Sequence, residues 1–379
     1  MLQLGMRHDG VAGACLADTV DHHMFHRFHV PILTPGTPSA MSTYALIAGG
    51  GIRVNYATGC MCRLKQMDSP LLQDTWCCVR SQCWIHPGKR LATDCDLGNT
   101  YDKFANTEFV HKPNTCAMVS RAVSMYTGYR DAFYNNEQLK STLLHLVGGK
   151  MVTGAQSIRV YAIDTATQKQ HAFEFLKHNE VTVNPIVASC SIPALFPPVH
   201  IDGRKYVDGG LHNSFAVPDI KRGIQDPNVH LIMLFATSPW MGRRNDTHTL
   251  GFKRMLQDQL HALMELDHWH LMDMLDIEHD SVPNGRFMAL YKRHEHGLEL
   301  LQIMQPGHKR QTKHDLAVIF FAPTPLEYVG AESVSLKDHP SARKPTSDMM
   351  LSKGKIAAAE VNTLASEIGL GWSHRIRFT

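Results

Sequence analysis

Residues 187–210 read VASCSIPALFPPVHIDGRKYVDGG, and this segment is the most informative part of the chain. Its three prolines exclude a continuous helix, because proline fixes its own φ and disfavours helix in the residue before it. Two short apolar runs then flank Asp202-Gly203, which is a strong β-hairpin signal. We therefore expect Asp208 at the end of the second hairpin strand, followed by two glycines that permit close backbone approach.

Strand and helix signals alternate along much of the chain. Apolar runs between turn residues predict strands at 44–48, 76–79, 158–163, 230–236 and 316–321, and helical periodicity predicts helices at 55–66, 138–147, 252–277 and 353–368. The run at 230–236 is apolar throughout, which is typical of a central strand covered on both faces. The alternation predicts an α/β fold with a mostly parallel sheet and helices on both of its faces.

Composition sets the broad class of the protein. The chain has 379 residues, 44% of them apolar, which suffices for one large α/β domain. A net charge of +3 gives no case for nucleic-acid binding, and nine unevenly spread cysteines do not form a disulfide framework. No secretory signal is visible, and no apolar run approaches the roughly 18 residues that span a bilayer. We expect a soluble, cytoplasmic protein.

Residues 1–40 differ in composition from the rest. They contain a histidine cluster and three prolines, namely His22, His23, His26, His29, Pro31, Pro35 and Pro38. The histidines lack cysteine or carboxylate partners at metal-ligand spacing, so no metal site is expected there. We predict an N-terminal extension over residues 1–40 and a single domain over residues 41–379.

The segment 187–210 also resembles the second half of the catalytic site of patatin-like phospholipases. That family's pattern runs from a small-residue turn through Ile-Pro and Phe-Pro-Pro to a hairpin that ends in Asp-Gly-Gly. Further similarity, including Asn135–Leu139, Asn213 and segment 346–361, extends the resemblance over about residues 43–365.

The resemblance implies a three-layer α/β/α patatin-like fold and a lipid acyl hydrolase, a phospholipase or esterase. Such an enzyme acts on a lipid or phospholipid substrate through a Ser-Asp dyad and an acyl-enzyme, with no metal and no cofactor. Asp208 would be the base of the dyad, and Gly209 and Gly210 would border the substrate.

A glycine loop between a predicted strand and a predicted helix supplies a second candidate element. Unpaired N–H groups at a helix start carry partial positive charge. Gly49, Gly50 and Gly51 are therefore suited to hold the oxyanion of an acyl intermediate, or alternatively a phosphate. The loop is similar to the family's Gly-Gly-Gly-x-Arg-Gly, with a departure at Val54. Arg53 is either part of this site, where it would bind a phosphate headgroup or stabilise the loop, or a surface arginine at the helix start.

The nucleophile is ambiguous, because the family's Gly-x-Ser-x-Gly occurs nowhere in the sequence. By spacing the best match is Ser81 in Val79-Arg80-Ser81-Gln82-Cys83, where bulky residues replace both glycines of a turn that needs close strand–helix approach. A second candidate is Cys116, as a thiol nucleophile. The remaining alternative is a catalytically inactive patatin-fold protein that retains lipid binding or a structural role.

The predicted helix 252–277 has a broad apolar face with several methionines: Met255, Met264, Met272 and Met274. Flexible methionines adapt to irregular ligands. This face is either packed core, or it lines an acyl-chain channel or makes transient contact with a membrane surface. The sequence does not indicate an oligomeric state.

Overall fold

The computed structural model assigns residues 40–379 to one unit of the chain. Within it the structure describes residues 42–49, 54–67, 69, 71, 75–79, 115–147, 151–152, 158–175, 180–211, 215–240, 266–295, 297–305, 313–328 and 339–367. The predicted N-terminal extension, residues 1–40, lies outside the described residues.

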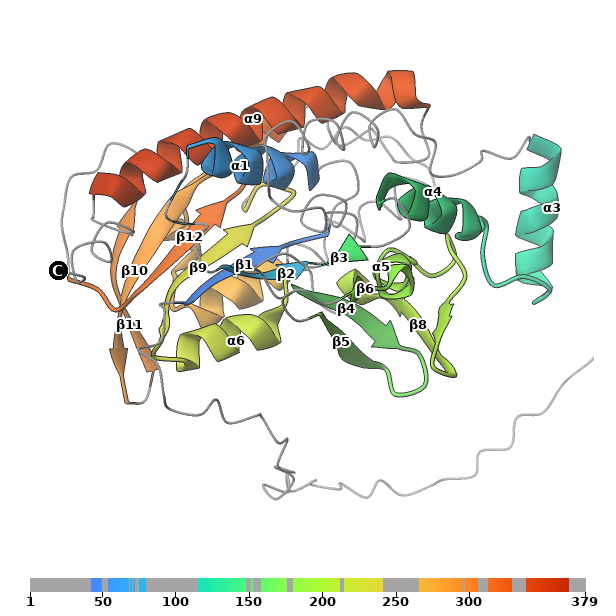
Figure 1. Ribbon diagram of the computed structural model, residues 1–379, viewed down its shortest axis with the longest axis horizontal. Coiled ribbons are helices and arrows are strands. Elements are labelled where there is room, and N and C mark those ends of the chain that lie inside the picture. Colours follow the sequence, from blue (N-terminus) through green and yellow to red (C-terminus); the bar gives the residue numbers. More distant parts are fainter. Residues whose placement is uncertain are drawn as a thin grey trace, which may run out of the picture. The chain divides into compact units, whose positions relative to one another are not determined.

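A ten-stranded sheet organises the described part of the chain, in the order β11-β10-β12-β9-β1-β2-β4-β8-β7 with β5 beside β4 (Figure 1). The strands are β1 Ser42–Ile47, β2 Thr75–Val79, β4 Ile158–Asp164, β5 Lys169–Phe175, β7 Val199–Ile201, β8 Arg204–Asp208, β9 Val229–Phe235, β10 Phe287–His294, β11 Gly297–Met304 and β12 Leu316–Phe321. The neighbours from β12 through β9, β1 and β2 to β4 pair in parallel. Antiparallel strands complete both flanks. The predicted α/β class is confirmed, and the parallel strands form the centre of the sheet.

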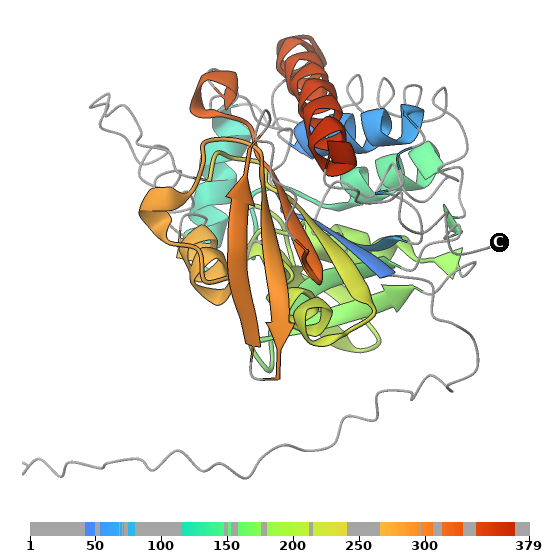
Figure 2. The same ribbon diagram turned by 90° about the vertical axis from the view of Figure 1, so that its left-hand side faces the viewer.

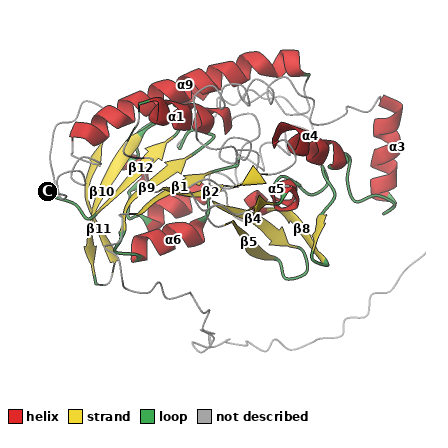
Figure 3. Cartoon of the chain, in the orientation of Figure 1, coloured by secondary structure: helices red, strands yellow, loops and turns green. Residues whose placement is uncertain are grey.

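Helices cover both faces of this sheet (Figure 3). The α-helices whose bounds lie within the described residues are α1 Asn55–Gln66, α3 Thr115–Tyr126, α4 Glu137–Val147, α5 Val183–Ser189, α6 Val217–Gln225, α8 Pro325–Tyr328 and α9 Pro340–Glu367. One apolar cluster joins α1, α4, α5 and α9 to one face, and a second joins α6 and the helical residues 266–274 to the other. Figure 2 shows α9 and α1 above the sheet, and the antiparallel pair β10 and β11 at the edge nearest the viewer. A separate two-stranded pair consists of β3 Met151–Val152 and β6 Glu180–Val181.

Helices α1 and α9 cross at two glycines. A Cβ atom added at Gly59 would lie 2.1 Å from the backbone oxygen of Leu351, and one added at Gly354 would lie 2.0 Å from that of Tyr56. Neither space admits a side chain, because the nearest atoms belong to backbone. The crossing therefore fixes α1 against α9 at backbone-to-backbone contact.

Most predicted elements occur where the sequence placed them, with some differences. The predicted hairpin is present as β7 and β8, and the turn residues Asp202 and Gly203 have φ of 48° and 76°. Helix α9 begins at Pro340 instead of residue 353, so the prediction of its start was wrong: proline is tolerated in the first helical turn. The small-residue segment at 187–189, predicted as a turn, is the end of helix α5.

Candidate active site

Asp208 is the last residue of β8 and is buried, with 9% of its surface exposed. Its backbone N–H donates to the Ser191 carbonyl oxygen at 2.9 Å. Its carboxylate oxygen Oδ1 accepts a hydrogen bond from the Gly210 N–H at 2.7 Å. The strand end and these two bonds fix both the backbone and the carboxylate of this residue.

Gly209 and Gly210 each occupy a position where a side chain would meet a different group. A Cβ atom at Gly209 would lie 2.5 Å from the Tyr161 carbonyl oxygen of β4, so the chain crosses the β4 backbone where only glycine fits. A Cβ atom at Gly210 would lie 3.0 Å from Asp208 Oδ1. The turn therefore leaves β8 and passes against β4, and β4 is the neighbour of β2.

The register aligns the ends of the parallel strands. Ile47 of β1 pairs with Val79 of β2 and with Phe235 of β9, and Val79 also pairs with Val160 of β4. Two residues beyond Val160, Ala162 pairs with Asp208. The Asp208 backbone thus lies just past the carboxyl ends of β1 and β2, where open α/β sheets bind ligands.

The start of the glycine loop lies past the end of β1, at the same offset of two residues. Gly49 follows Ile47 by two positions, and its carbonyl oxygen accepts a hydrogen bond from the buried Thr237 hydroxyl at 2.8 Å. Thr237 itself follows Phe235 of β9 by two positions. Gly50, Gly51 and Arg53 lie outside the described residues, so their predicted roles stay predictions.

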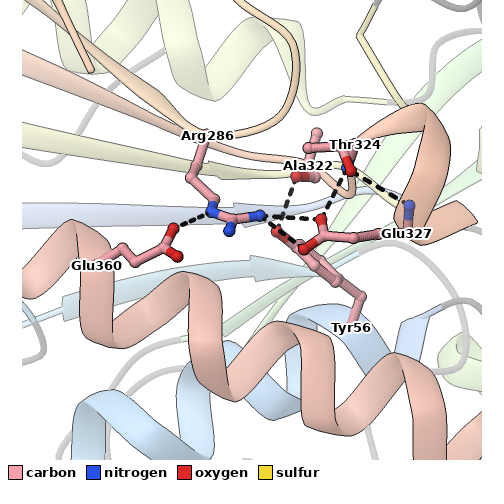
Figure 4. Close-up of polar contacts among 6 residues, drawn as sticks. All are labelled: Tyr56, Arg286, Ala322, Thr324, Glu327 and Glu360. Atoms are coloured by element: carbon pink, nitrogen blue, oxygen red, sulfur yellow. Dashed lines mark hydrogen bonds and ion pairs between the residues drawn. The ribbon is translucent and has the colours of Figure 1, made fainter. Parts of the chain in front are cut away.

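Helix α1, which follows the glycine loop, is anchored by a polar cluster (Figure 4). The buried Tyr56 hydroxyl donates to the Ala322 carbonyl oxygen at 2.8 Å. Burial raises the pKa of Tyr56, so the phenol stays neutral and remains a donor. Arg286 bonds both Glu327 oxygens, at 2.9 and 3.0 Å, and also pairs with Glu360 of α9. The cluster fixes the first turn of α1 to the ends of β12 and α9.

Within the same cluster, Thr324 and Glu327 form a reciprocal cap on α8. The Thr324 N–H donates to Glu327 Oε2 at 2.9 Å, and the Glu327 N–H donates to Thr324 Oγ1 at 3.2 Å. This arrangement satisfies backbone donors at the helix start and orients the Glu327 carboxylate toward Arg286.

A buried charge network holds the chain that follows the Asp-Gly-Gly turn. Asp219 of α6 is fully buried and bonds the Arg159 guanidinium and the Tyr161 hydroxyl, both on β4. Arg222 adds a contact to Asp219 at 3.0 Å, and Arg159 also pairs with Glu174 of β5 at 2.7 Å. The network secures α6 to β4, the strand that Gly209 crosses.

A second polar contact supports the residues before Asp208. The Asn136 side-chain amide donates to the Pro197 carbonyl oxygen at 3.1 Å and to the Ser191 hydroxyl at 3.4 Å. Beside Asn136 opens a cavity of about 210 Å³, whose lining includes Glu137, Lys140 and His200 but not Asp208.

The two candidate nucleophiles are placed differently. Ser81 lies outside the described residues, two positions after the end of β2. Cys116 is exposed near the start of α3, whereas Asp208 is buried. The described residues contain no group of three or more His, Cys, Asp or Glu side chains that could hold a metal ion.

The sequence did not single out Thr237, Tyr56, Arg159 or Asp219 as parts of this site. Their hydrogen-bond partners are distant in the sequence, so no local sequence pattern predicts these contacts. The one local signal for Asp219 is that it follows Pro218 directly, since proline and acidic residues are both common in the first turn of a helix.

The structure describes residues 266–277 of the predicted methionine-rich helix 252–277. Of the predicted span 252–277, residues 266–274 are helical, and Leu271, Met272 and Leu275 are buried in the core. For these residues the packed-core alternative is confirmed. Residues 252–265 lie outside the described residues, so the alternative of an acyl-chain channel or a membrane contact on that part of the helix stays a prediction. No helix among the described residues is long and apolar enough to cross a membrane.

Comparisons with known proteins place this site in context. No curated protein sequence matches the chain significantly. Among solved structures, human GIVD cytosolic phospholipase A2 in complex with methyl gamma-linolenyl fluorophosphonate inhibitor and terbium chloride has a TM-score of 0.44 and 11% identity, over 89% of this chain and 60% of that one. VipD from Legionella pneumophila has a TM-score of 0.37 and 10% identity, over 86% of this chain and 67% of that one. At these scores the likeness carries no argument about function.

The family comparison is more specific, and it falls on the segment that contains Asp208. A family model described as "Patatin-like phospholipase" matches residues 107–219, which include α3 to α5, the hairpin and the Asp-Gly-Gly turn. The glycine loop and Ser81 precede the matched region. Over residues 107–219 the chain is therefore similar to the patatin-like phospholipase family.

Proposed function

We propose that the protein is a lipid acyl hydrolase of the phospholipase or esterase type, with Ser81 as nucleophile and Asp208 as base. The observation that carries this proposal is the common offset of two residues beyond the aligned strand ends. Gly49 follows Ile47 by two positions, Ser81 follows Val79 by two, and Ala162, the partner of Asp208, follows Val160 by two.

The strand order supports the same assignment. Strand β2 lies between β1, which leads to the glycine loop, and β4, which the Asp-Gly-Gly turn crosses. Adjacent strands are about 4.8 Å apart, so β1 and β8 are separated by about 14 Å. A nucleophile carried by β2 would be positioned between an oxyanion-binding loop on one side and a base on the other.

In the proposed reaction the Ser81 oxygen attacks the acyl carbonyl carbon while the Asp208 carboxylate accepts the hydroxyl proton. The carbonyl oxygen becomes an oxyanion, which the N–H groups of Gly49 to Gly51 stabilise. The alcohol, or lysophospholipid, leaves with the proton from Asp208. Water then hydrolyses the acyl-enzyme by the reverse roles, and no metal or cofactor takes part.

The decisive experiment compares variants on a soluble chromogenic ester and on phosphatidylcholine. Ser81→Ala and Asp208→Asn should each lower kcat by at least about 10³-fold, because nucleophile and base act as a unit. Asp202→Asn is the matched control: it makes the same change in the same hairpin, at an exposed position where φ is 48°, which asparagine tolerates. Hydrolysis retained in Ser81→Ala would exclude Ser81, and its loss in Cys116→Ser would favour the thiol instead.

A second candidate is a non-catalytic lipid-binding protein, and the absence of Gly-x-Ser-x-Gly anywhere in the sequence favours it. A fluorophosphonate probe distinguishes the two, because it forms a stable bond with an activated serine. Labelling at Ser81 that disappears in Asp208→Asn supports the hydrolase. Lipid binding without labelling and without hydrolysis would support the non-catalytic alternative.

A further inference from the structure

Helix α3 carries apolar side chains that face solvent. Val119 is 60% exposed, Val123 57% and Tyr126 94%, and Tyr129 in the following turn is 88% exposed. Residues 119, 123 and 126 are spaced to form one stripe along a helix. Figure 1 shows α3 standing apart from the labelled helices that cover the sheet.

The charged residues of 115–130 have one sign, and the exposed Asp131 follows them. Residues 115–130 contain Arg121 and Arg130 and no aspartate or glutamate. An apolar stripe with exposed tyrosines and flanking arginines is the pattern of a helix that lies in the interface of an anionic membrane. Twelve residues give about 18 Å of helix, which is too short to span a bilayer.

Arg121, in the middle of α3, connects this helix to the segment that leads to the candidate active site. Arg121 donates to the Phe133 carbonyl oxygen at 2.9 Å. The Phe133 N–H donates to the Ala194 carbonyl oxygen at 2.9 Å, and the Tyr134 N–H donates to that of Leu195 at 2.8 Å. Ala194 lies three residues after Ser191, whose carbonyl oxygen accepts the Asp208 N–H. A membrane bound by α3 would therefore lie near the end of β8 that carries Asp208.

We propose that α3, with the turn that carries Tyr129 and Arg130, docks on the surface of an anionic phospholipid bilayer. The docking surface consists of Met118, Val119, Val123, Tyr126, Tyr129 and Arg130. This inference deepens the proposed function by naming the physical state of its substrate, and it can be tested without hydrolysis. The buried residues 271–275 of the methionine-rich helix have no part in it.

The test is co-sedimentation of the full chain with phosphatidylcholine vesicles, with and without phosphatidylserine. We expect the double variant Val119→Asp/Val123→Asp to bind vesicles at least about tenfold more weakly. Arg130→Gln should weaken binding about fivefold on the anionic vesicles only. Ile356→Asp, which alters another half-exposed apolar residue on α9, is the matched control and should bind as the unmodified protein does.

Two further measurements keep the outcomes separate. The double variant should retain its far-ultraviolet circular dichroism and its rate on a soluble ester, since neither Val119 nor Val123 is a proposed catalytic residue. A Tyr126→Trp variant should show quenching by brominated phospholipid in vesicles. The absence of quenching, or equal vesicle binding by the double variant and the unmodified protein, would overturn the proposal. A third outcome would also overturn the proposal: the unmodified protein binds no vesicles and is an oligomer, whereas the double variant is a monomer. In that case α3 would be a self-association surface.

Discussion

Gly209→Ala tests whether the Asp-Gly-Gly turn positions a catalytic carboxylate. The new Cβ atom would lie 2.5 Å from the Tyr161 oxygen and 2.8 Å from its carbonyl carbon, against an ordinary contact of at least 3.4 Å. Since β4 is hydrogen-bonded on both sides, the turn must move away by about 0.9 Å. A misplacement of about 1 Å at a reacting group costs about 10²-fold in rate. We expect kcat on a soluble ester to fall by that factor.

The matched control is Gly203→Ala, at the tip of the same hairpin. No atom lies within 4 Å of the added Cβ there, but φ is +76°, so alanine costs about 1–2 kcal/mol of strain. Gly209→Ala should cost a comparable amount of stability, about 1–3 kcal/mol, through overpacking. Urea denaturation measures both changes in stability, and ester hydrolysis measures the rates. If Gly209→Ala kept the rate of Gly203→Ala, the turn would not position a catalytic group.

Three further predictions concern stability. Gly354→Ala should lower the free energy of unfolding by about 3 kcal/mol or more, because its Cβ would lie 2.0 Å from the Tyr56 oxygen; an unchanged urea midpoint would contradict the close crossing. Asp219→Asn should lower the free energy of unfolding by about 3–5 kcal/mol, because the buried Arg159 would lose the negative charge that it pairs with. Arg222→Gln, which removes the exposed partner of Asp219, should lower it by less than about 1 kcal/mol. Burial lowers the pKa of His268 from 6.5 to about 4, so between these pH values the unfolded chain binds a proton that the folded chain does not. The free energy of unfolding should therefore fall by up to about 3 kcal/mol as the pH drops from 6.5 to 4. The variant His268→Phe should lose this part of the pH dependence, and an unaltered stability profile would refute the reasoning.

The sequence predicted the elements whose local pattern and tertiary role agree. Helix α1 and strand β12 have the predicted bounds, and the hairpin of β7 and β8 turns at Asp202-Gly203, as predicted. In these segments the turn residues and the apolar periodicity indicate the same structure, so local signals suffice.

Other elements conflict with their local signals. Helix α5 has seven residues and includes Pro185 and several β-branched side chains, so its helical state depends on packing against β4 and β8. Helix α3 was not predicted, although Val119, Val123 and Tyr126 recur at helical spacing in its sequence.

The candidate site was predictable only residue by residue. The Asp-Gly-Gly sequence identified Asp208 and the two glycines, but it did not indicate that Gly209 crosses β4. Tyr56 and Ala322 are 266 positions apart, and Thr237 and Gly49 are 188 apart. Such contacts follow from the strand order, which one sequence does not specify. The assignment of Ser81 still rests on its offset from Val79 and stays a prediction.

The glycine crossing of α1 and α9 also sets an order of events during synthesis. Gly59 emerges from the ribosome about 300 positions before the backbone of Leu351 that it contacts, and translation at about 5–20 residues per second makes this interval about 15–60 s. Strand β1 likewise cannot pair with β9, its neighbour on one side, until β9 has been synthesised. During this interval the Gly59 face of α1 lacks the α9 backbone against which it packs in the complete chain. A nascent chain arrested before α9 would contain Ser81 and Asp208 and still lack one of the two helices at this crossing, so the close packing of α1 and α9 forms only when synthesis is nearly complete.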